Sequence, residues 1–75
     1  MINIQDIIPF MKEGWVAMDE DKEWNWWQNE PEQRIKNDVY SYWWKIDGYM
    51  VCLSTVFDIA PADDWTKSLI KVGGK

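Results

Sequence analysis

A chain of 75 residues with a net charge of −5, seven tryptophans, one cysteine and no histidine has few ways to build or use a domain. Its length excludes a second catalytic lobe, and its negative charge argues against binding nucleic acid polymers or anionic membranes. Without histidine, and with Cys52 alone, we expect no disulfide, no zinc site and no histidine-assisted nucleophile. The composition therefore predicts one domain over residues 1–75 that is not an enzyme and uses no metal or cofactor.

The tryptophans are too numerous for so small a core to cover completely. Each large aromatic side chain can bury roughly 150 to 250 Å², and Trp24, Trp26 and Trp27 nearly adjoin one another. Some indoles must then lie at a surface, a pocket or a subunit interface. Because a single core below about 80 residues supplies only roughly 3 to 5 kcal/mol, we expect rich aromatic packing or oligomerisation to supply the rest.

The chain carries no pattern typical of export or membrane insertion. Asp6 interrupts the first apolar stretch, no small-residue cleavage site follows it, and no apolar run approaches about 18 residues. A free cysteine is also usual inside cells. These features predict a cytoplasmic protein.

The first half of the sequence predicts a short helix followed by a hairpin. Residues 3–13 have apolar side chains at helical spacing behind Asn3 as the N-cap, Pro9 kinks or divides the helix, and Gly14 ends it. Residues 15–18 and 23–28 then read as two strands joined by the acidic turn 19–22.

The second half predicts another hairpin and a final short element. Residues 29–33 are a break, and residues 34–38 are a loop or a short turn of helix. Asp47-Gly48 is a strong hairpin signal and would join strands 39–46 and 49–57. Asp63 or Asp64 would cap a last element, helical by the spacing of Trp65, Leu69 and Val72, or extended over 68–72.

Together these elements predict an α+β fold: a small twisted antiparallel sheet of about four to five strands, containing two hairpins, with a short N-terminal helix. Alternate side chains of a strand share a face. Trp24 and Trp26 should therefore point one way and Trp27 the other, and Trp43 and Trp44 should also point oppositely.

Flat aromatic faces with nearby cations and hydroxyls suit the stacking and hydrogen bonding of a nucleobase. We expect the core to contain Trp15, Trp65 and either Trp43 or Trp44, with the other lining a groove. The candidate ligand surface comprises aromatic, basic and hydroxyl or carboxyl side chains: Trp24, Trp26, Trp27, Arg34, Lys36, Lys45, Ser54, Thr55 and Asp58. Solvation, strand termination and local capping are the structural alternatives for the polar members of this set.

Several short motifs resemble those of the phage anti-Thoeris nucleotide sponges, the second Thoeris anti-defence family. Asp47-Gly48, then Val51, then residues 62–65 (Ala-Asp-Asp-Trp) match that family's hairpin and closing motif at the same separation. Lys12-Glu13-Gly14 with Val16 resembles its helix-to-strand turn, and Trp24 corresponds to the tryptophan that follows. The chain departs from the pattern at Leu53, where the family has tryptophan, and Thr55 and Asp58 align only with a shift.

The resemblance implies a phage protein that acts in the cytoplasm of an infected bacterium. Such a protein binds a nucleotide immune messenger, a cyclic ADP-ribose isomer or a cyclic oligonucleotide, without degrading it, and assembles as a homo-oligomer. A small phage inhibitor that binds a host or defence protein through an acidic, tryptophan-rich surface is the alternative, because tryptophans are also enriched at protein interfaces. A small structural subunit is a third.

Overall fold

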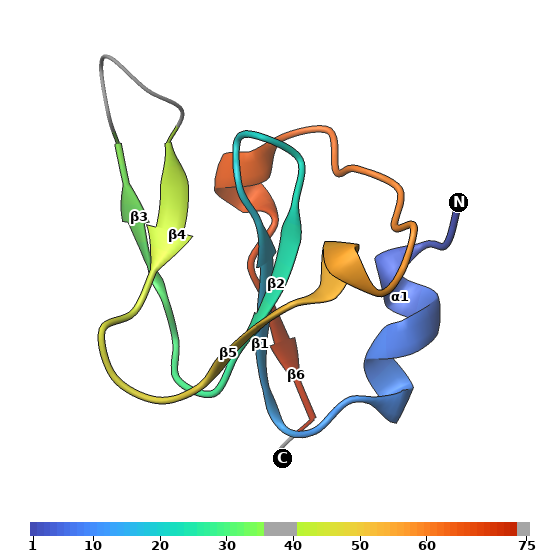
Figure 1. The fold of residues 1–75 in the computed structure, drawn as a ribbon, viewed down its shortest axis with the longest axis horizontal. Coiled ribbons are helices and arrows are strands. Elements are labelled where there is room, and N and C mark those ends of the chain that lie inside the picture. Colours follow the sequence, from blue (N-terminus) through green and yellow to red (C-terminus); the bar gives the residue numbers. More distant parts are fainter. Residues whose placement is uncertain (36–40, 74–75) are drawn as a thin grey trace.

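The computed structural model describes residues 1–35 and 41–73 and has the expected α+β architecture. A four-stranded antiparallel sheet has the order β5-β2-β1-β6, and β3 pairs with β4 in a separate two-stranded sheet (Figure 1). The strands are β1 (Gly14–Met18), β2 (Trp24–Trp27), β3 (Glu32–Arg34), β4 (Tyr42–Trp44), β5 (Met50–Cys52) and β6 (Ile70–Val72). The helices are α1 (Ile4–Ile7) and the 3₁₀ turns η1 (Ile8–Phe10), η2 (Leu53–Thr55) and η3 (Trp65–Lys67).

The N-terminal helix is divided, as its sequence predicts. The Asn3 side chain caps α1 by accepting a hydrogen bond from the Gln5 backbone N–H at 2.9 Å. Pro9 lies within the 3₁₀ turn η1 that follows directly, where its missing N–H is tolerated. Gly14 does not end a helix, because it is already the first residue of β1. There a Cβ would lie 2.5 Å from the Trp27 carbonyl oxygen, so only glycine fits.

The first hairpin is confirmed: β1 and β2 pair in the register Trp15↔Trp27 to Met18↔Trp24. Its turn closes with the Lys22 N–H donating to the Asp19 carbonyl oxygen at 2.9 Å. Lys22 has a φ of 74°, a left-handed conformation that glycine adopts more easily than any other residue. The turn therefore forms even though the backbone conformation of Lys22 is unfavourable.

The predicted hairpin between residues 39–46 and 49–57 is wrong. β4 pairs instead with β3 (Gln33↔Trp43), and β5 pairs with β2 (Trp26↔Val51). Gly48 has the positive φ that its turn requires, at 83°, but the turn connects the two sheets. Asparagine and glutamine side chains at the end of β2 surround it, and the Tyr49 carbonyl accepts from the Gln28 N–H at 2.8 Å. Pairing with the apolar strand β2 therefore prevails over a local hairpin. Residues 29–35 also differ from expectation, because β3 (Glu32–Arg34) occupies part of the predicted break and the start of the predicted loop. The rest of that loop, residues 36–38, lies outside the described residues.

The C-terminal element is a 3₁₀ turn and a strand, so the extended alternative is confirmed in part and the helical one is wrong. The Asp64 side chain caps η3, accepting from the Thr66 N–H at 3.0 Å. The Thr66 hydroxyl also donates to the Asp64 carboxylate, at 2.6 Å, and this bond together with the backbone bond holds the pKa of Asp64 below its usual value. β6 then returns along β1, with Val16 opposite Ile70. This strand closes the sheet on the side opposite β5.

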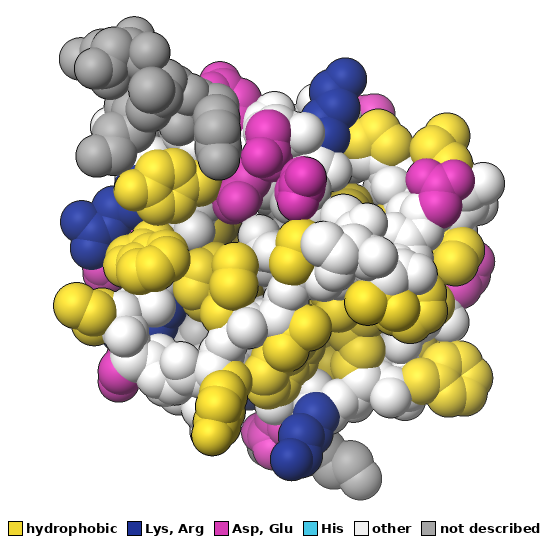
Figure 2. Space-filling model, in the orientation of Figure 1, with side chains coloured by type: hydrophobic (Ala, Val, Ile, Leu, Met, Phe, Trp, Pro, Cys, Tyr) yellow, Lys and Arg dark blue, Asp and Glu magenta, His cyan; other side chains and the backbone are white. Residues whose placement is uncertain are grey.

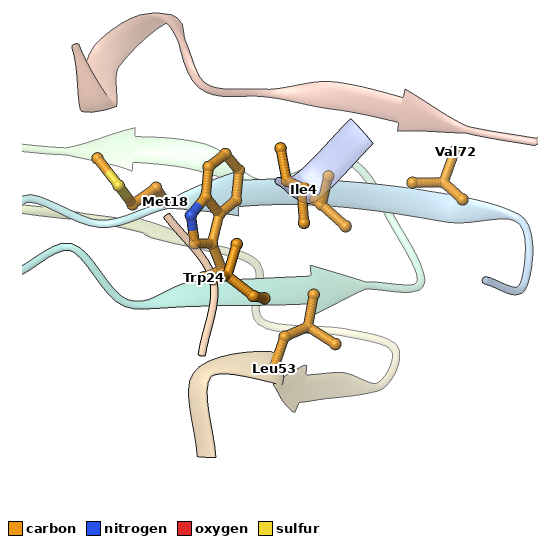
Figure 3. Close-up of a cluster of buried hydrophobic side chains, with 7 residues drawn as sticks. Ile4, Met18, Trp24, Leu53 and Val72 are labelled. Carbon is orange, nitrogen blue, oxygen red and sulfur yellow. The ribbon is translucent and has the colours of Figure 1, made fainter. Parts of the chain in front are cut away.

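One face of the sheet packs against α1 and the loops around η2. Its buried side chains form a closed apolar cluster in which Trp24 lies near the centre (Figure 3). The cluster comprises Ile4, Val16, Met18, Trp24, Leu53, Ile59 and Val72. The indole N–H of Trp24 donates to the Ala60 carbonyl oxygen at 3.1 Å, so this buried polar atom is satisfied.

The opposite face is covered by the β3–β4 hairpin, which lies across the sheet from α1 (Figure 1). Ala17, Trp27 and Trp43 form its buried cluster, with Trp15, Trp65 and Leu69 packed around them. The Trp43 indole N–H donates to the Trp65 carbonyl oxygen at 3.1 Å, and the Gln33 amide donates to the Thr66 carbonyl oxygen at 2.7 Å. These two bonds fasten one side of the hairpin to η3.

Candidate functional site

The strand alternation is as predicted, but the assignment of tryptophans to core and surface is not. Trp24 and Trp26 pack on the α1 side and Trp27 on the hairpin side. Trp24 and Trp27 are each only 1 % exposed, so they do not form a surface. The reason is position: β2 is an inner strand, flanked by β1 and β5. The predicted core residues Trp15 and Trp65 are only half-buried.

Trp43 and Trp44 divide as the sequence predicts, one into the core and one into a groove. Trp43 is buried, whereas Trp44 is 42 % exposed. Trp44 borders an open hollow of about 300 Å³ whose other lining residues are Asp19, Tyr42, Trp43 and Met50. We call this hollow the aromatic groove.

The indole of Trp44 is held from two directions. Its ring lies edge-to-face against Trp27, with centroids 6.1 Å apart and an interplanar angle of 81°. It also meets Tyr42 edge-to-face at 6.4 Å and 90°. Such aromatic pairs add roughly 0.5 to 1.5 kcal/mol beyond burial. Trp44 is thus an exposed aromatic side chain in a fixed orientation, which reduces the entropy lost when a ring stacks on it.

Asp19 supplies the titratable group of the aromatic groove. Its carboxylate accepts from the Trp43 backbone N–H at 2.8 Å and from the Asn25 side-chain amide at 3.2 Å. Desolvation by burial raises the pKa of Asp19 to about 6, with the nearby charges of Asp21 and Glu23 acting in the same direction. The groove therefore changes charge close to neutral pH.

Two residues of β2, Asn25 and Trp27, each carry a buried polar atom without a partner. Asn25 Oδ1 and Trp27 Nε1 have no hydrogen-bond partner within residues 1–35 and 41–73. The Asn25 side-chain amide donates to Asp19, and Trp27 is paired in register with Met50, so both adjoin residues that line the groove. Neither residue lines the groove itself, so the cost of these two atoms falls on the stability of the fold.

Arg34, one of the predicted cations, shares a face of the β3–β4 hairpin with two groove residues. It is directly opposite Tyr42, and paired residues of an antiparallel ladder share a face. Trp44 is on that face too, two residues along. Lys45 lines a separate polar hollow, and its ammonium nitrogen lies 3.8 Å from an Asp47 carboxylate oxygen. Lys36 falls outside the described residues.

The predicted polar residues Ser54, Thr55 and Asp58 line another shallow hollow, together with Lys22. Ser54 Oγ accepts from the Trp24 backbone N–H at 2.8 Å, and the Thr55 hydroxyl donates to the Cys52 carbonyl at 2.8 Å. These contacts complete the end of β5. The predicted site residues therefore do not form one site. Trp24 and Trp27 are buried, Arg34 is in the β3–β4 hairpin, and Ser54, Thr55 and Asp58 line this hollow.

Sequence reasoning missed three members of the aromatic groove: Asp19, Tyr42 and Met50. Tyr42 could have been found, because it is two residues before Trp44 and shares its face of the strand. Asp19 and Met50 could not, since their place depends on how the hairpin crosses the sheet.

No family model, no curated protein and no solved structure matches the chain. Within residues 1–35 and 41–73, no helix has the length and apolar character needed to cross a membrane. The same residues contain no group of three or more cysteine or acidic side chains placed to hold a metal ion.

Proposed function

We propose that this protein binds a nucleotide through the aromatic groove and sequesters it without breaking a bond. The observation that carries the proposal is Trp44, a half-exposed indole fixed edge-to-face against a buried tryptophan at the rim of an open hollow. Stacking a base on such a side chain contributes about 1 to 3 kcal/mol. A binding site, unlike an active site, needs no nucleophile or general base beside it.

The polar groups around the groove fit the other parts of a nucleotide. Arg34 shares the face of Tyr42 and Trp44 and supplies a planar cation for a phosphate. The Asp19 carboxylate offers acceptors to base or ribose N–H and O–H groups. With a net charge of −5, the chain repels an anionic ligand at long range, so we expect binding to depend strongly on Arg34.

The motif resemblance to the anti-Thoeris nucleotide sponges supports the same ligand class. On this proposal the protein comes from a phage, acts in the cytoplasm of the infected bacterium, and captures a cyclic ADP-ribose isomer or a cyclic oligonucleotide. Its oligomers would present several such grooves at once. Leu53, which replaces the family's tryptophan, is buried in the α1-side cluster and leaves the groove unchanged.

A ligand-retention experiment tests the proposal. The protein is incubated with cyclic ADP-ribose isomers and cyclic dinucleotides, separated from free ligand and heated, and the supernatant is examined by mass spectrometry. We expect one nucleotide to be released intact. Trp44→Ala should lower retention about 5- to 150-fold, the equivalent of 1 to 3 kcal/mol. Phe10→Ala is the matched control, because Phe10 is 88 % exposed and outside the groove. Retention of no nucleotide, or equal loss in both variants, would contradict the proposal.

A second candidate function is the inhibition of a host or defence protein, and one observation favours it. Glu20, Asp21 and Glu23 are exposed in the β1–β2 turn, next to the groove residue Asp19. Figure 2 shows acidic side chains gathered over this turn, beside hydrophobic side chains over the β3–β4 hairpin. An aromatic anchor with a charged rim is typical of protein interfaces. For this function we expect Trp44→Ala to abolish binding of the protein partner. Free nucleotides should not compete with that partner for the wild-type chain.

A further inference from the structure

The outer edge of β5 is an open sheet edge with an apolar surface. β5 is the end strand of the sheet, and it contains Met50, Val51 and Cys52, with no charge and no proline. Met50 is 43 % exposed and Val51 48 % exposed, although they point to opposite faces. Such an edge is a ready template for pairing with another strand.

The register shows which backbone groups point outward from this edge. The Gln28 N–H donates to the Tyr49 carbonyl, so the pair Gln28↔Tyr49 is hydrogen-bonded. Hydrogen-bonded and non-hydrogen-bonded pairs alternate along an antiparallel ladder, which makes Trp26↔Val51 hydrogen-bonded as well. The N–H and C=O groups of Met50 and Cys52 therefore face away from the sheet. The Cys52 carbonyl oxygen accepts a hydrogen bond from the Thr55 hydroxyl, and its second lone pair can accept another.

The opposite edge of the sheet, β6, is protected in a way that β5 is not. β6 carries Lys71, whose ammonium lies 3.7 Å from Glu13 and 4.8 Å from the centre of the Trp15 ring. A lysine on an edge strand is a common device against unwanted pairing. Of the two edges of the four-stranded sheet, β5 is therefore the one without such a protecting charge.

We infer that β5 pairs antiparallel with β5 of a second copy of this chain, with Val51 on the two-fold axis. In this register Met50 of each copy is opposite Cys52 of the other in a hydrogen-bonded pair, so the outward N–H and C=O groups of both residues gain a partner. The pairing is self-complementary, as a two-fold interface requires. It joins two four-stranded sheets into one continuous sheet.

Charge identifies a second copy as the occupant. The segment 44–57, which runs from the groove through β5 and η2, contains one lysine and one aspartate and is neutral, whereas the whole chain carries −5. Two acidic chains can therefore approach through this segment with the least repulsion. A basic peptide, by contrast, would be attracted to the acidic β1–β2 turn.

The proposed interface adjoins the aromatic groove. Met50 forms one wall of the groove, and its backbone would bond to the second copy across the axis. Strand pairing would therefore hold this wall in place. The dimer is an inference about assembly that does not depend on which ligand binds, so it can hold even when no nucleotide is retained.

Light scattering with a matched pair of variants tests the interface. The wild-type chain should have twice the 9.0 kDa mass of one chain. Val51→Glu places two carboxylates at the centre of β5 next to the axis and should give the single-chain mass. Val56→Glu is the control, because Val56 is 70 % exposed but outside β5, and it should remain dimeric. A single-chain mass for the wild type at several hundred micromolar, or a Val51→Glu variant that stays dimeric, would overturn the inference.

A disulfide test keeps the inference falsifiable when a variant is poorly folded. Residues in a non-hydrogen-bonded antiparallel pair have Cα atoms about 4.5 Å apart, within the range of a disulfide. In a Cys52→Ser background, Val51→Cys should therefore oxidise rapidly to a covalent dimer, and Val56→Cys should not. Equal rates of cross-linking for the two variants would show that β5 does not lie on a two-fold axis.

Discussion

The two faces of the four-stranded sheet use tryptophan differently. On the α1 side, Trp24 is enclosed by aliphatic side chains, and its indole N–H has a carbonyl partner. On the hairpin side, Trp27 is equally buried, but its indole N–H has no partner in the described residues, and the exposed Trp44 rests against it. The first face therefore contributes mainly to the stability of the fold. The second face has an open groove with a titratable carboxyl, and the proposed binding site lies there.

The largest expected effect is the loss of the enclosed tryptophan. Trp24→Ala should lower the free energy of unfolding by about 3 to 5 kcal/mol, because it leaves a cavity in the α1-side cluster. Chemical denaturation followed by circular dichroism measures this change. Trp44→Ala is the matched comparison and should cost much less, since Trp44 is already 42 % exposed. Equal destabilisation by the two variants would remove the distinction between the faces.

A smaller effect is expected where the two faces meet at the start of β1. Gly14→Ala should destabilise the fold by about 1 to 3 kcal/mol, because its Cβ would lie 2.5 Å from the Trp27 carbonyl oxygen and 2.7 Å from the Trp26 ring. The thermal midpoint of unfolding measures the loss. Gly73→Ala is a useful comparison, since its Cβ would meet no atom closer than 3.3 Å, and any loss there would come from its φ of 63°, a strain that Gly14 does not have. A Gly14→Ala variant as stable as the wild type would mean that β1 and β2 pack more loosely than described.

The groove face should also make stability depend on pH. The pKa of Asp19 is raised to about 6 in the fold, above its ordinary value of 3.8. Its protonated form is therefore favoured by folding: this contribution is fully present below about pH 4 and is lost as pH rises through 6. The difference in unfolding free energy between the wild type and Asp19→Asn, measured from pH 4 to pH 7, should follow that course.

Asp19→Asn is a suitable reference because an amide keeps one acceptor for the Trp43 N–H, and Asn25 can accept from its NH₂ group. Asp21 and Glu23 are the charges that act on Asp19, and they are unchanged in the variant. A difference that stays constant across this range would show that burial does not perturb this carboxyl.

The smallest effect lies in the β1–β2 turn, outside both clusters. Lys22→Gly should stabilise the fold by up to about 1 kcal/mol, because glycine adopts the φ of 74° without strain. Lys22→Ala is the control, since it removes the charge and keeps the Cβ. A stabilised alanine variant would point to charge instead of backbone conformation.

Local signals predicted the local features of this fold. Asn3 and Asp64 cap their helices, Pro9 divides the first one, and the β1–β2 hairpin forms around its acidic turn. The Asp47-Gly48 signal predicted the turn correctly but not the strands that it joins. A dipeptide determines backbone angles over two residues, whereas strand pairing depends on apolar burial along the whole chain.

The candidate site was less predictable, for the same reason. Alternation assigned Trp43 and Trp44 to opposite faces, but it could not show that β2 lies inside the sheet, which buries Trp24 and Trp27. Arg34 lies on the same face of the hairpin as Tyr42 and Trp44 because β3 forms in a segment that the sequence predicts to be a loop. Strand order therefore decides which aromatic residues are accessible.

The most direct test of the binding face is calorimetric titration of the wild type, Trp44→Ala and Arg34→Gln with the nucleotide that the protein retains. We expect 5- to 150-fold weaker binding for Trp44→Ala, with a smaller loss of unfolding free energy than for Trp24→Ala. For Arg34→Gln we expect weaker binding and a smaller dependence of affinity on salt. Undiminished affinity in Trp44→Ala would contradict the assignment of the aromatic groove as the binding site.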